Sequence, residues 1–143
     1  MTVYLDTSAL VKLYVTESGS DAVAALVQQA QIVTTSAVAY AETRAALARL
    51  RRERRLTAPG LAAARRSFER DWPSYLSLDV TAALCVEAGA LAEQYGLRGF
   101  DSIHLASFAR IVDRVGVGNV TFSCFDDRLA AAARRLMRSH ARH

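Results

Sequence analysis

The sequence predicts an α/β protein, a three-layer α/β/α sandwich whose central, mainly parallel sheet has four to five strands. Short apolar runs with β-branched residues alternate with longer segments of helical periodicity, which is typical of a parallel sheet covered by helices. The chain has 143 residues, and 52% of them are hydrophobic. This length suits one compact domain with a sizeable core. We therefore expect a single domain over residues 1–138 and a frayed tail over residues 139–143.

The predicted elements follow one another along the whole chain. No clear strand follows the last helix, so we expect the sheet to be short or irregular at that edge. The strands are predicted at Thr2–Leu5, Ile32–Thr34, Leu76–Leu78 and Val120–Phe122. After a short helix over 8–14, longer helices are predicted near 20–30, 36–52, 58–72, 80–95, 102–114 and 127–138.

Several helix ends can be read from residue type. Ser20 or Asp21 is suited to cap the helix near 20–30, because short polar side chains accept hydrogen bonds from free backbone N–H groups. Thr57 and Pro59 open the helix near 58–72, and Gly96 ends the helix near 80–95.

The charge balance favours a polyanionic partner. The formal net charge is +4, and all of the eighteen basic residues except Lys12 are arginines. Nucleic acid would suit this charge, although the arginine content is equally explained by compositional bias of the genome. Cys85 and Cys124 have neither disulfide-framework nor zinc-site spacing, so we expect both to be small buried side chains. Neither a secretory signal nor a membrane span is recognisable, and we expect a cytoplasmic protein without membrane contact.

Three aspartates lie where a strand meets a helix or where a helix begins. Asp6 and Asp126 directly follow predicted strands, and Asp101 precedes a helical pattern. The carboxyl edge of a parallel sheet is where such folds bind ligands, but each aspartate alone is equally suited to cap a helix. Asp127 is the residue most easily confused with Asp126. Asp79 has a similar position, and we expect it to be only a cap.

Glu42 cannot be explained by capping, because it lies in the middle of a predicted helix. Its neighbours on the same face are Val38, Ala39, Ala45 and Ala46, so we expect the carboxylate to project from an apolar stripe toward the core. A charge in that position is costly unless it is paired with a cation or a metal ion.

These acids suit a magnesium site for phosphodiester hydrolysis. Mg²⁺ prefers hard oxygen ligands, and four converging carboxylates would repel one another without a cation. His104, His140 and His143 have no useful ligand spacing, and we expect His104 to be a hydrogen-bonded core histidine.

Four segments, in this order and spacing, resemble the PIN-domain family, and among its members the VapC-like toxins of bacterial toxin–antitoxin pairs. The resemblance spans nearly the whole chain. The segments are Tyr4–Tyr14, Ala41–Glu42, Leu97–Ala106 and Phe125–Leu129.

The resemblance implies an endoribonuclease that hydrolyses RNA with one or two Mg²⁺ or Mn²⁺ ions. It also implies a homodimer and an antitoxin partner that covers the site. Ser8 would position a water or a phosphate. Cys124 stands where the family usually has Ser or Thr, which makes the choice of Asp126 over Asp127 less secure. The catalytic, metal-binding acids would be Asp6, Glu42, Asp101 and Asp126.

A cluster of arginines offers a surface for the RNA backbone, although a solvated helical face explains it equally well. We single out Arg44, Arg51, Arg52 and Arg55 as candidate RNA contacts. The whole cluster comprises Arg44, Arg49, Arg51, Arg52, Arg54, Arg55, Arg65 and Arg66.

Three other functions remain to be weighed. A phosphatase or phospho-acceptor domain is disfavoured, because position 8 is Ser rather than Asp and the only lysine is Lys12. A non-catalytic PIN-like binding module would be expected to have lost an acid, and none is lost. A PIN nuclease that processes RNA without an antitoxin is the closest alternative.

Overall fold

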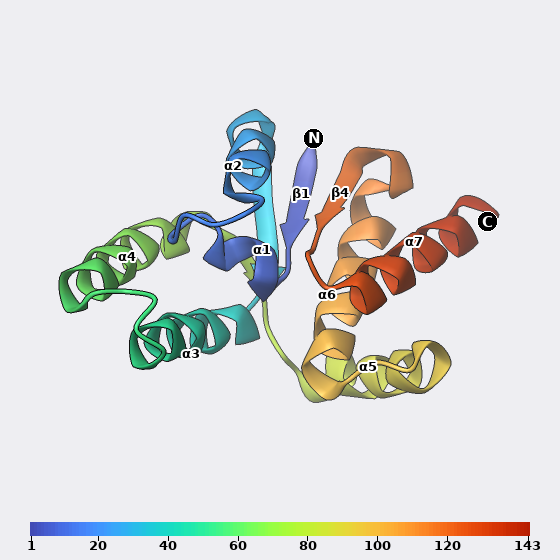
Figure 1. The fold of residues 1–143 in the computed structure, drawn as a ribbon. Coiled ribbons are helices and arrows are strands. Elements are labelled where there is room, and N and C mark those ends of the chain that lie inside the picture. Colours follow the sequence, from blue (N-terminus) through green and yellow to red (C-terminus); the bar gives the residue numbers. More distant parts are fainter.

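A computed structural model describes all residues from Met1 to His143 and confirms the predicted fold class. Its core is one sheet of four parallel strands in the order β3-β2-β1-β4, with helices on both faces (Figure 1). No fifth strand follows the last helix. The strands are β1 (Thr2–Leu5), β2 (Ile32–Ser36), β3 (Leu76–Leu78) and β4 (Val120–Ser123).

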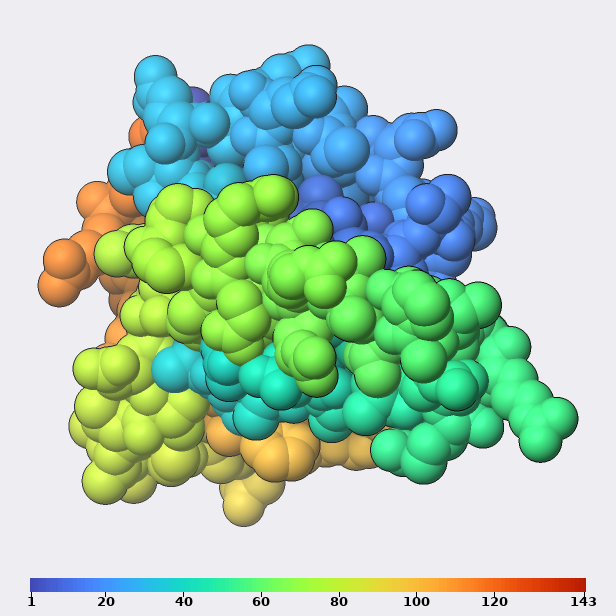
Figure 2. Space-filling view, turned by 90° about the vertical axis from the view of Figure 1, so that its left-hand side faces the viewer, coloured from blue at the N-terminus to red at the C-terminus, as the bar shows by residue number.

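Two groups of helices cover the sheet, α1 to α4 on one side and α5 to α7 on the other (Figure 1). On the first side, α4 lies across the middle of the surface between α2 and α3 (Figure 2). None of the helices has the length and apolar character that a membrane crossing requires. The helices are α1 (Thr7–Val11), α2 (Ser20–Gln29), α3 (Val38–Arg52), α4 (Ala58–Asp71), α5 (Ala82–Tyr95), α6 (Gly99–Val115) and α7 (Asp127–Ala141), with 3₁₀ turns η1 (Trp72–Ser74) and η2 (Val117–Asn119).

Strand β1 organises both halves of the core, because successive side chains of a strand point to opposite faces. Val3 and Leu5 pack with Phe68 and other residues from α1 to α4. Tyr4 points the other way and packs with Phe108 and further residues of α6 and α7. The side chains of Val3, Tyr4, Leu5, Phe68 and Phe108 are each at most 1% exposed. The two cores fix the position of the carboxyl edge of the sheet between the two helical layers.

Some helices begin or end at the residues that the sequence predicted. The Thr57 hydroxyl accepts a hydrogen bond from Gly60 N at 3.0 Å, and Gly96 ends α5 in the left-handed conformation, with φ of 65°. The prediction for α2 was wrong, because Gly19 is its cap and the Ser20 hydroxyl instead accepts from Glu17 N. Gly19 leaves little room for a larger residue, since an added Cβ would overlap the Phe125 ring.

Four further expectations need correction. Asp79 caps nothing, because α5 begins three residues after it, at Ala82, and Thr81 provides the cap. Asp101 lies inside the first turn of α6 rather than before the helix. Cys85 is exposed rather than buried, and Cys124 is only partly buried. Helix α7 continues to Ala141, so most of the tail expected to be frayed is helical.

Candidate active site

The four acids reach one edge of the molecule from four elements. Asp6 follows β1, and Asp126 lies between β4 and α7. Asp101 lies in the first turn of α6, while Glu42 projects from the middle of α3. Because all four strands are parallel, their carboxyl ends lie at this same edge, between the helical layers (Figure 1).

Asp6 is held rigidly, and its side chain is a helix cap as well as a candidate ligand. Only 4% of the residue is exposed. Its Oδ1 accepts hydrogen bonds from the Ser8 hydroxyl at 2.7 Å and from Ala9 N at 3.0 Å. The same hydroxyl accepts from Phe125 N at 2.9 Å. Ser8 therefore orients Asp6 in this arrangement and has no hydroxyl proton left for a water or a phosphate.

Cys124 takes the position where the resemblance led us to expect a hydroxyl. Its Sγ lies 3.1 Å from Asp6 Oδ2. Burial raises the pKa of the Cys124 thiol far above its ordinary value, and the nearby Asp6 carboxylate raises it further. The thiol therefore stays protonated and donates to Asp6, which is the contact that a serine or threonine hydroxyl would make.

Glu42 is held by a chain of hydrogen bonds that begins in the core. Tyr4 OH lies 2.9 Å from His104 Nδ1, and His104 Nε2 lies 2.9 Å from Glu42 Oε1. Thr7 donates to the same carboxylate oxygen at 2.6 Å. Burial raises the pKa of the Tyr4 hydroxyl, so we assign Tyr4 as the donor to Nδ1. His104 Nε2 then carries the proton that it donates to Glu42.

These contacts keep Glu42 ionised. Burial alone would raise its pKa, but the hydrogen bonds from His104 and Thr7 outweigh burial and lower it. The carboxylate does not lie in the core as the sequence suggested. The buried face of α3 is formed by Ala39, Thr43 and Leu47, and the Glu42 side chain lies beside it, 27% exposed.

Asp101 and Asp126 lie on either side of one arginine. Arg98 Nε is 3.6 Å from Asp101 Oδ2, and another guanidinium nitrogen of Arg98 is 3.9 Å from Asp126 Oδ2. Burial and then the charge of Asp126 raise the pKa of Asp101, and Asp6 adds to this effect. Arg98 opposes it only in part, which is consistent with a guanidinium that is 82% exposed.

The structure brings Asp126, rather than Asp127, toward the other acids. Asp126 Oδ1 accepts from Leu129 N at 2.9 Å, so this residue caps α7 while its other oxygen faces Arg98. Asp127 is an exposed residue in the first turn of α7 and makes no such contact.

A divalent cation fits the donor chemistry of this edge. Carboxylate oxygens are the ligands that Mg²⁺ prefers, and a cationic group already lies between Asp101 and Asp126. As the side chains stand, no three acids, histidines or cysteines converge closely enough to surround an ion. The reason is visible in the contacts, since Asp6 is turned toward α1 and Glu42 toward His104.

A hollow of about 680 Å³ adjoins the acids on the α3 side. Of the arginines singled out from the sequence, Arg52 and Arg55 line it together with Glu42. Arg44 instead pairs with Glu69 at 2.8 Å, and Arg51 points to the carbonyl of Leu56. The hollow also contains Arg49, which belongs to the wider arginine cluster, and Lys12, which the sequence interpretation missed.

The sequence interpretation also missed Thr7, Arg98 and His104 as parts of the site. Arg98 and His104 lie three residues before and after Asp101, a spacing that places side chains on one helical face. That signal was available for both residues. The contact of Thr7 with Glu42 joins residues 35 positions apart, so no local pattern announces it.

The fold and the site together define a PIN domain. The PIN-domain family model matches residues 3–112, and the chain belongs to that family. Two curated relatives from Mycobacterium tuberculosis are each 42% identical to it over 111 residues, which is 78% of this chain and 77% of the relative. They are named Ribonuclease VapC45, from strain CDC 1551 / Oshkosh, and Ribonuclease VapC49, from strain ATCC 25618 / H37Rv.

A solved structure supports the fold independently. The crystal structure of VapC20 from Mycobacterium tuberculosis, described as a toxin that cleaves the sarcin–ricin loop, aligns with a TM-score of 0.65. The alignment covers 91% of this chain and 94% of that one at 20% identity, so it is evidence for the fold alone. The family model ends before β4, and the position of Asp126 therefore rests on its contacts.

Replacing Asp101 with Asn should stabilise the protein when no metal is bound. The pKa of Asp101 is raised above its ordinary value of 3.8, so keeping it ionised at pH 7 costs folding free energy. We expect Asp101→Asn to raise Tm at pH 7 in EDTA, and the gain to vanish below pH 3.8, where the carboxyl is protonated in both folded and unfolded chains. Thermal melts followed by circular dichroism measure both effects.

Asp127→Asn is the matched control for this charge change. Asp127 lies in the first turn of α7, where a negative charge is favourable, so its loss should leave Tm unchanged or lower it. An equal rise in Tm for both variants would mean that overall charge, and not repulsion within the site, sets the effect.

Proposed function

We propose that this chain is a metal-dependent endoribonuclease that acts as the toxin of a toxin–antitoxin pair. The proposal rests on the position of Asp6, Glu42, Asp101 and Asp126 at the same edge of a PIN domain. The two curated relatives at 42% identity are named ribonucleases, which supports RNA as the substrate. RNA is a cytoplasmic substrate, and we place the protein there.

In this proposal Asp6, Glu42, Asp101 and Asp126 hold one or two Mg²⁺ or Mn²⁺ ions. When bound, the metal supplies a water of lowered pKa and positive charge close to the scissile phosphate. Asp6 keeps a fixed orientation because Ser8, Ala9 and Cys124 donate to it. Asp6 and Asp101 would be the primary ligands.

Glu42 and Asp126 complete the ligand set or orient the attacking water. Because the pKa of Glu42 is lowered, this carboxylate is available as an acceptor at neutral pH. His104 acts through Glu42, since its Nε2–H fixes the carboxylate oxygen at 2.9 Å. Arg98 lies beside Asp101 and Asp126, where its exposed guanidinium can turn toward a phosphate once these acids bind a metal.

The RNA backbone would run from the acids into the hollow lined by Lys12, Arg49, Arg52 and Arg55. Cations alongside a carboxylate site compensate for the negative charge that the substrate brings. We extend the proposal to a homodimer and to an antitoxin that covers the acids, as the family resemblance implies. A PIN nuclease that processes RNA without an antitoxin is the alternative.

The purified chain, freed of any partner protein, should cut single-stranded RNA in the presence of Mg²⁺ or Mn²⁺. Asp101→Asn and Asp6→Asn should each reduce the rate at least a hundredfold while the circular dichroism spectrum is unchanged. Asp127→Asn, an equal loss of charge outside the site, should cut normally. Cleavage is followed on denaturing gels, and full activity in EDTA would refute the metal-dependent mechanism.

The proposal that the chain is a toxin also predicts an effect on growing cells. Expression of the wild-type chain should arrest the growth of a bacterial host, and expression of Asp101→Asn should not. Normal growth with an active nuclease would favour the RNA-processing alternative.

Arg52→Gln combined with Arg55→Gln should flatten the salt dependence of RNA binding. Each phosphate contact on a single strand contributes about 0.7 to the slope of log K against log salt concentration, so loss of two contacts should reduce the slope by about 1.4. Fluorescence anisotropy at several salt concentrations measures it. Arg65→Gln with Arg66→Gln, on the exposed face of α4, removes the same charge and should leave the slope unchanged.

A further inference from the structure

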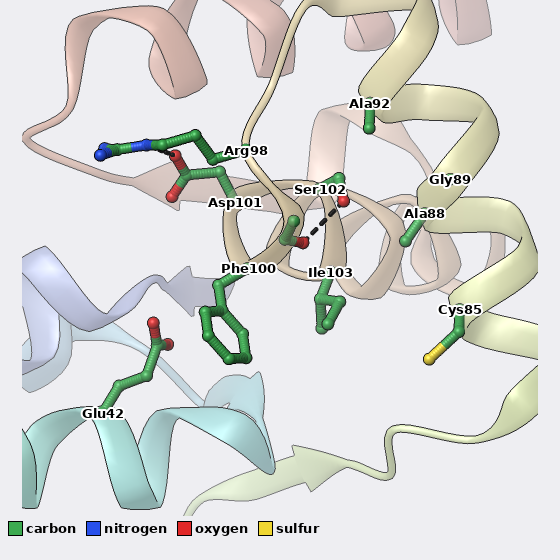
Figure 3. A pocket seen from close by; sticks show the side chains of 11 residues that line it. Glu42, Cys85, Ala88, Gly89, Ala92, Arg98, Phe100, Asp101, Ser102 and Ile103 are labelled. Atoms are coloured by element: carbon green, nitrogen blue, oxygen red, sulfur yellow. Dashed lines mark hydrogen bonds and ion pairs between the residues drawn. The ribbon is translucent and has the colours of Figure 1, made fainter.

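A groove on the other side of the acids has no role in the proposed function so far. It has a volume of about 740 Å³ and lies between α5 and the first turn of α6 (Figure 3). One end is bounded by Glu42 and Asp101. The groove is therefore continuous with the acidic edge, while its remaining walls are mostly apolar. Those walls include Cys85, Ala88, Gly89, Ala92, Phe100 and Ile103.

Phe100 is an aromatic ring without a partner. It lies next to Asp101 in the sequence, is 58% exposed, and projects into the groove on the side of Glu42 (Figure 3). No aromatic pair or cation–π contact includes it, whereas the comparable Phe125 lies under the Lys12 ammonium, 4.5 Å from the ring centroid. Leaving a phenylalanine face in water is unfavourable, so this face is suited to a flat apolar ligand.

Gly89 keeps the opposite wall open. It lies in the middle of α5, where glycine weakens a helix relative to alanine. Nothing in the fold requires a glycine there, because an added Cβ would meet no atom within 4 Å. The space above Gly89 is part of the groove itself. A larger residue at this position would therefore fill the groove without disturbing the packing of the helix.

Building on the proposed function, we propose that this groove is a subsite for a nucleobase of single-stranded RNA, stacked on Phe100 beside the scissile phosphate. Aromatic faces bind bases by stacking, and the distance along the chain between Phe100 and Asp101 is one residue. The Ser102 hydroxyl in the lining already donates to Gly99 O. The other polar side chains of the lining, Glu42, Arg98 and Asp101, are assigned in our proposal to the metal and the phosphate, so we expect the groove to accept any base.

The test is a double-mutant cycle in which a substitution of Phe100 is combined with removal of one base from the RNA substrate. An RNA oligonucleotide with one abasic position next to the cleaved bond should be cut roughly tenfold less efficiently than the intact one, as kcat/KM, because it cannot stack. Phe100→Ala should cause a similar loss with the intact RNA and little further loss with the abasic RNA. Phe100→Trp should retain activity, and exchange of the base at that position should have a small effect.

Two further variants distinguish the effect of filling the groove from the effect of any substitution in α5. Gly89→Leu should lower kcat/KM for intact RNA by filling the space above the helix. Ala90→Leu places the same leucine side chain one residue away, at an exposed position outside the lining, and should cut as the wild type does. Circular dichroism verifies that both variants are folded.

Cys85 supplies a readout that does not depend on activity. Its thiol is exposed within the groove, whereas Cys124 is partly buried and its pKa is strongly raised. Single-stranded RNA at saturating concentration should slow the reaction of Cys85 with a maleimide, and Gly89→Leu or Phe100→Ala should weaken this protection. Mass spectrometry of the labelled peptide identifies the thiol.

Failure of this subsite can be told apart from failure of the nuclease function. If the wild type cuts RNA while Phe100→Ala and Gly89→Leu cut equally well, the subsite is refuted and the nuclease stands. If the wild type neither cuts RNA nor shows RNA protection of Cys85, both proposals fall. Protection of Cys85 by a bound partner protein but not by RNA would assign the groove to a protein interface and overturn the subsite.

Discussion

The hydrogen-bonded chain from Tyr4 through His104 to Glu42 ties the sheet to both helical layers. Tyr4 belongs to β1, His104 to α6 and Glu42 to α3, so the chain crosses the sheet edge where the acids lie. Tyr4 and His104 are at most 2% exposed. Because a buried polar group without a partner is strongly unfavourable, breaking one link would leave the others unsatisfied. The position of the Glu42 carboxylate is therefore set by the core, and not by the mobility of a surface side chain.

The electrostatics of the edge divide the acids into two kinds. Hydrogen bonds from His104 and Thr7 stabilise the charge of Glu42, and donors from the surrounding chain orient Asp6. Asp101 is the opposite case, because burial and the charge of Asp126 make its ionised form unfavourable. Folding thus brings the charges of Asp101 and Asp126 together, and a bound cation would relieve their repulsion. The Arg98 guanidinium is too exposed to solvent to cancel it. We propose that relief of this repulsion favours binding of the metal ion.

The sequence predicted the fold class and the four strands closely, because short apolar runs with β-branched residues and helical periodicity are local signals. It also identified four acids that the structure brings to one edge. It failed where contacts join distant residues. No local pattern shows that Thr7 reaches Glu42 or that the Cys124 thiol replaces a hydroxyl beside Asp6. Capping was ambiguous for the same reason, since Asp6 and Asp126 are helix caps and also lie at the edge where the acids gather.

We propose that the acids at this edge bind a divalent metal ion as a group. Crystals of the chain soaked in Mn²⁺ test it most directly, through an anomalous difference map. We expect a peak bounded by Asp101 and at least one other of the four acids, with Arg98 displaced from its position between Asp101 and Asp126. A map without a peak at this edge, or with manganese only at surface carboxylates elsewhere, would contradict it.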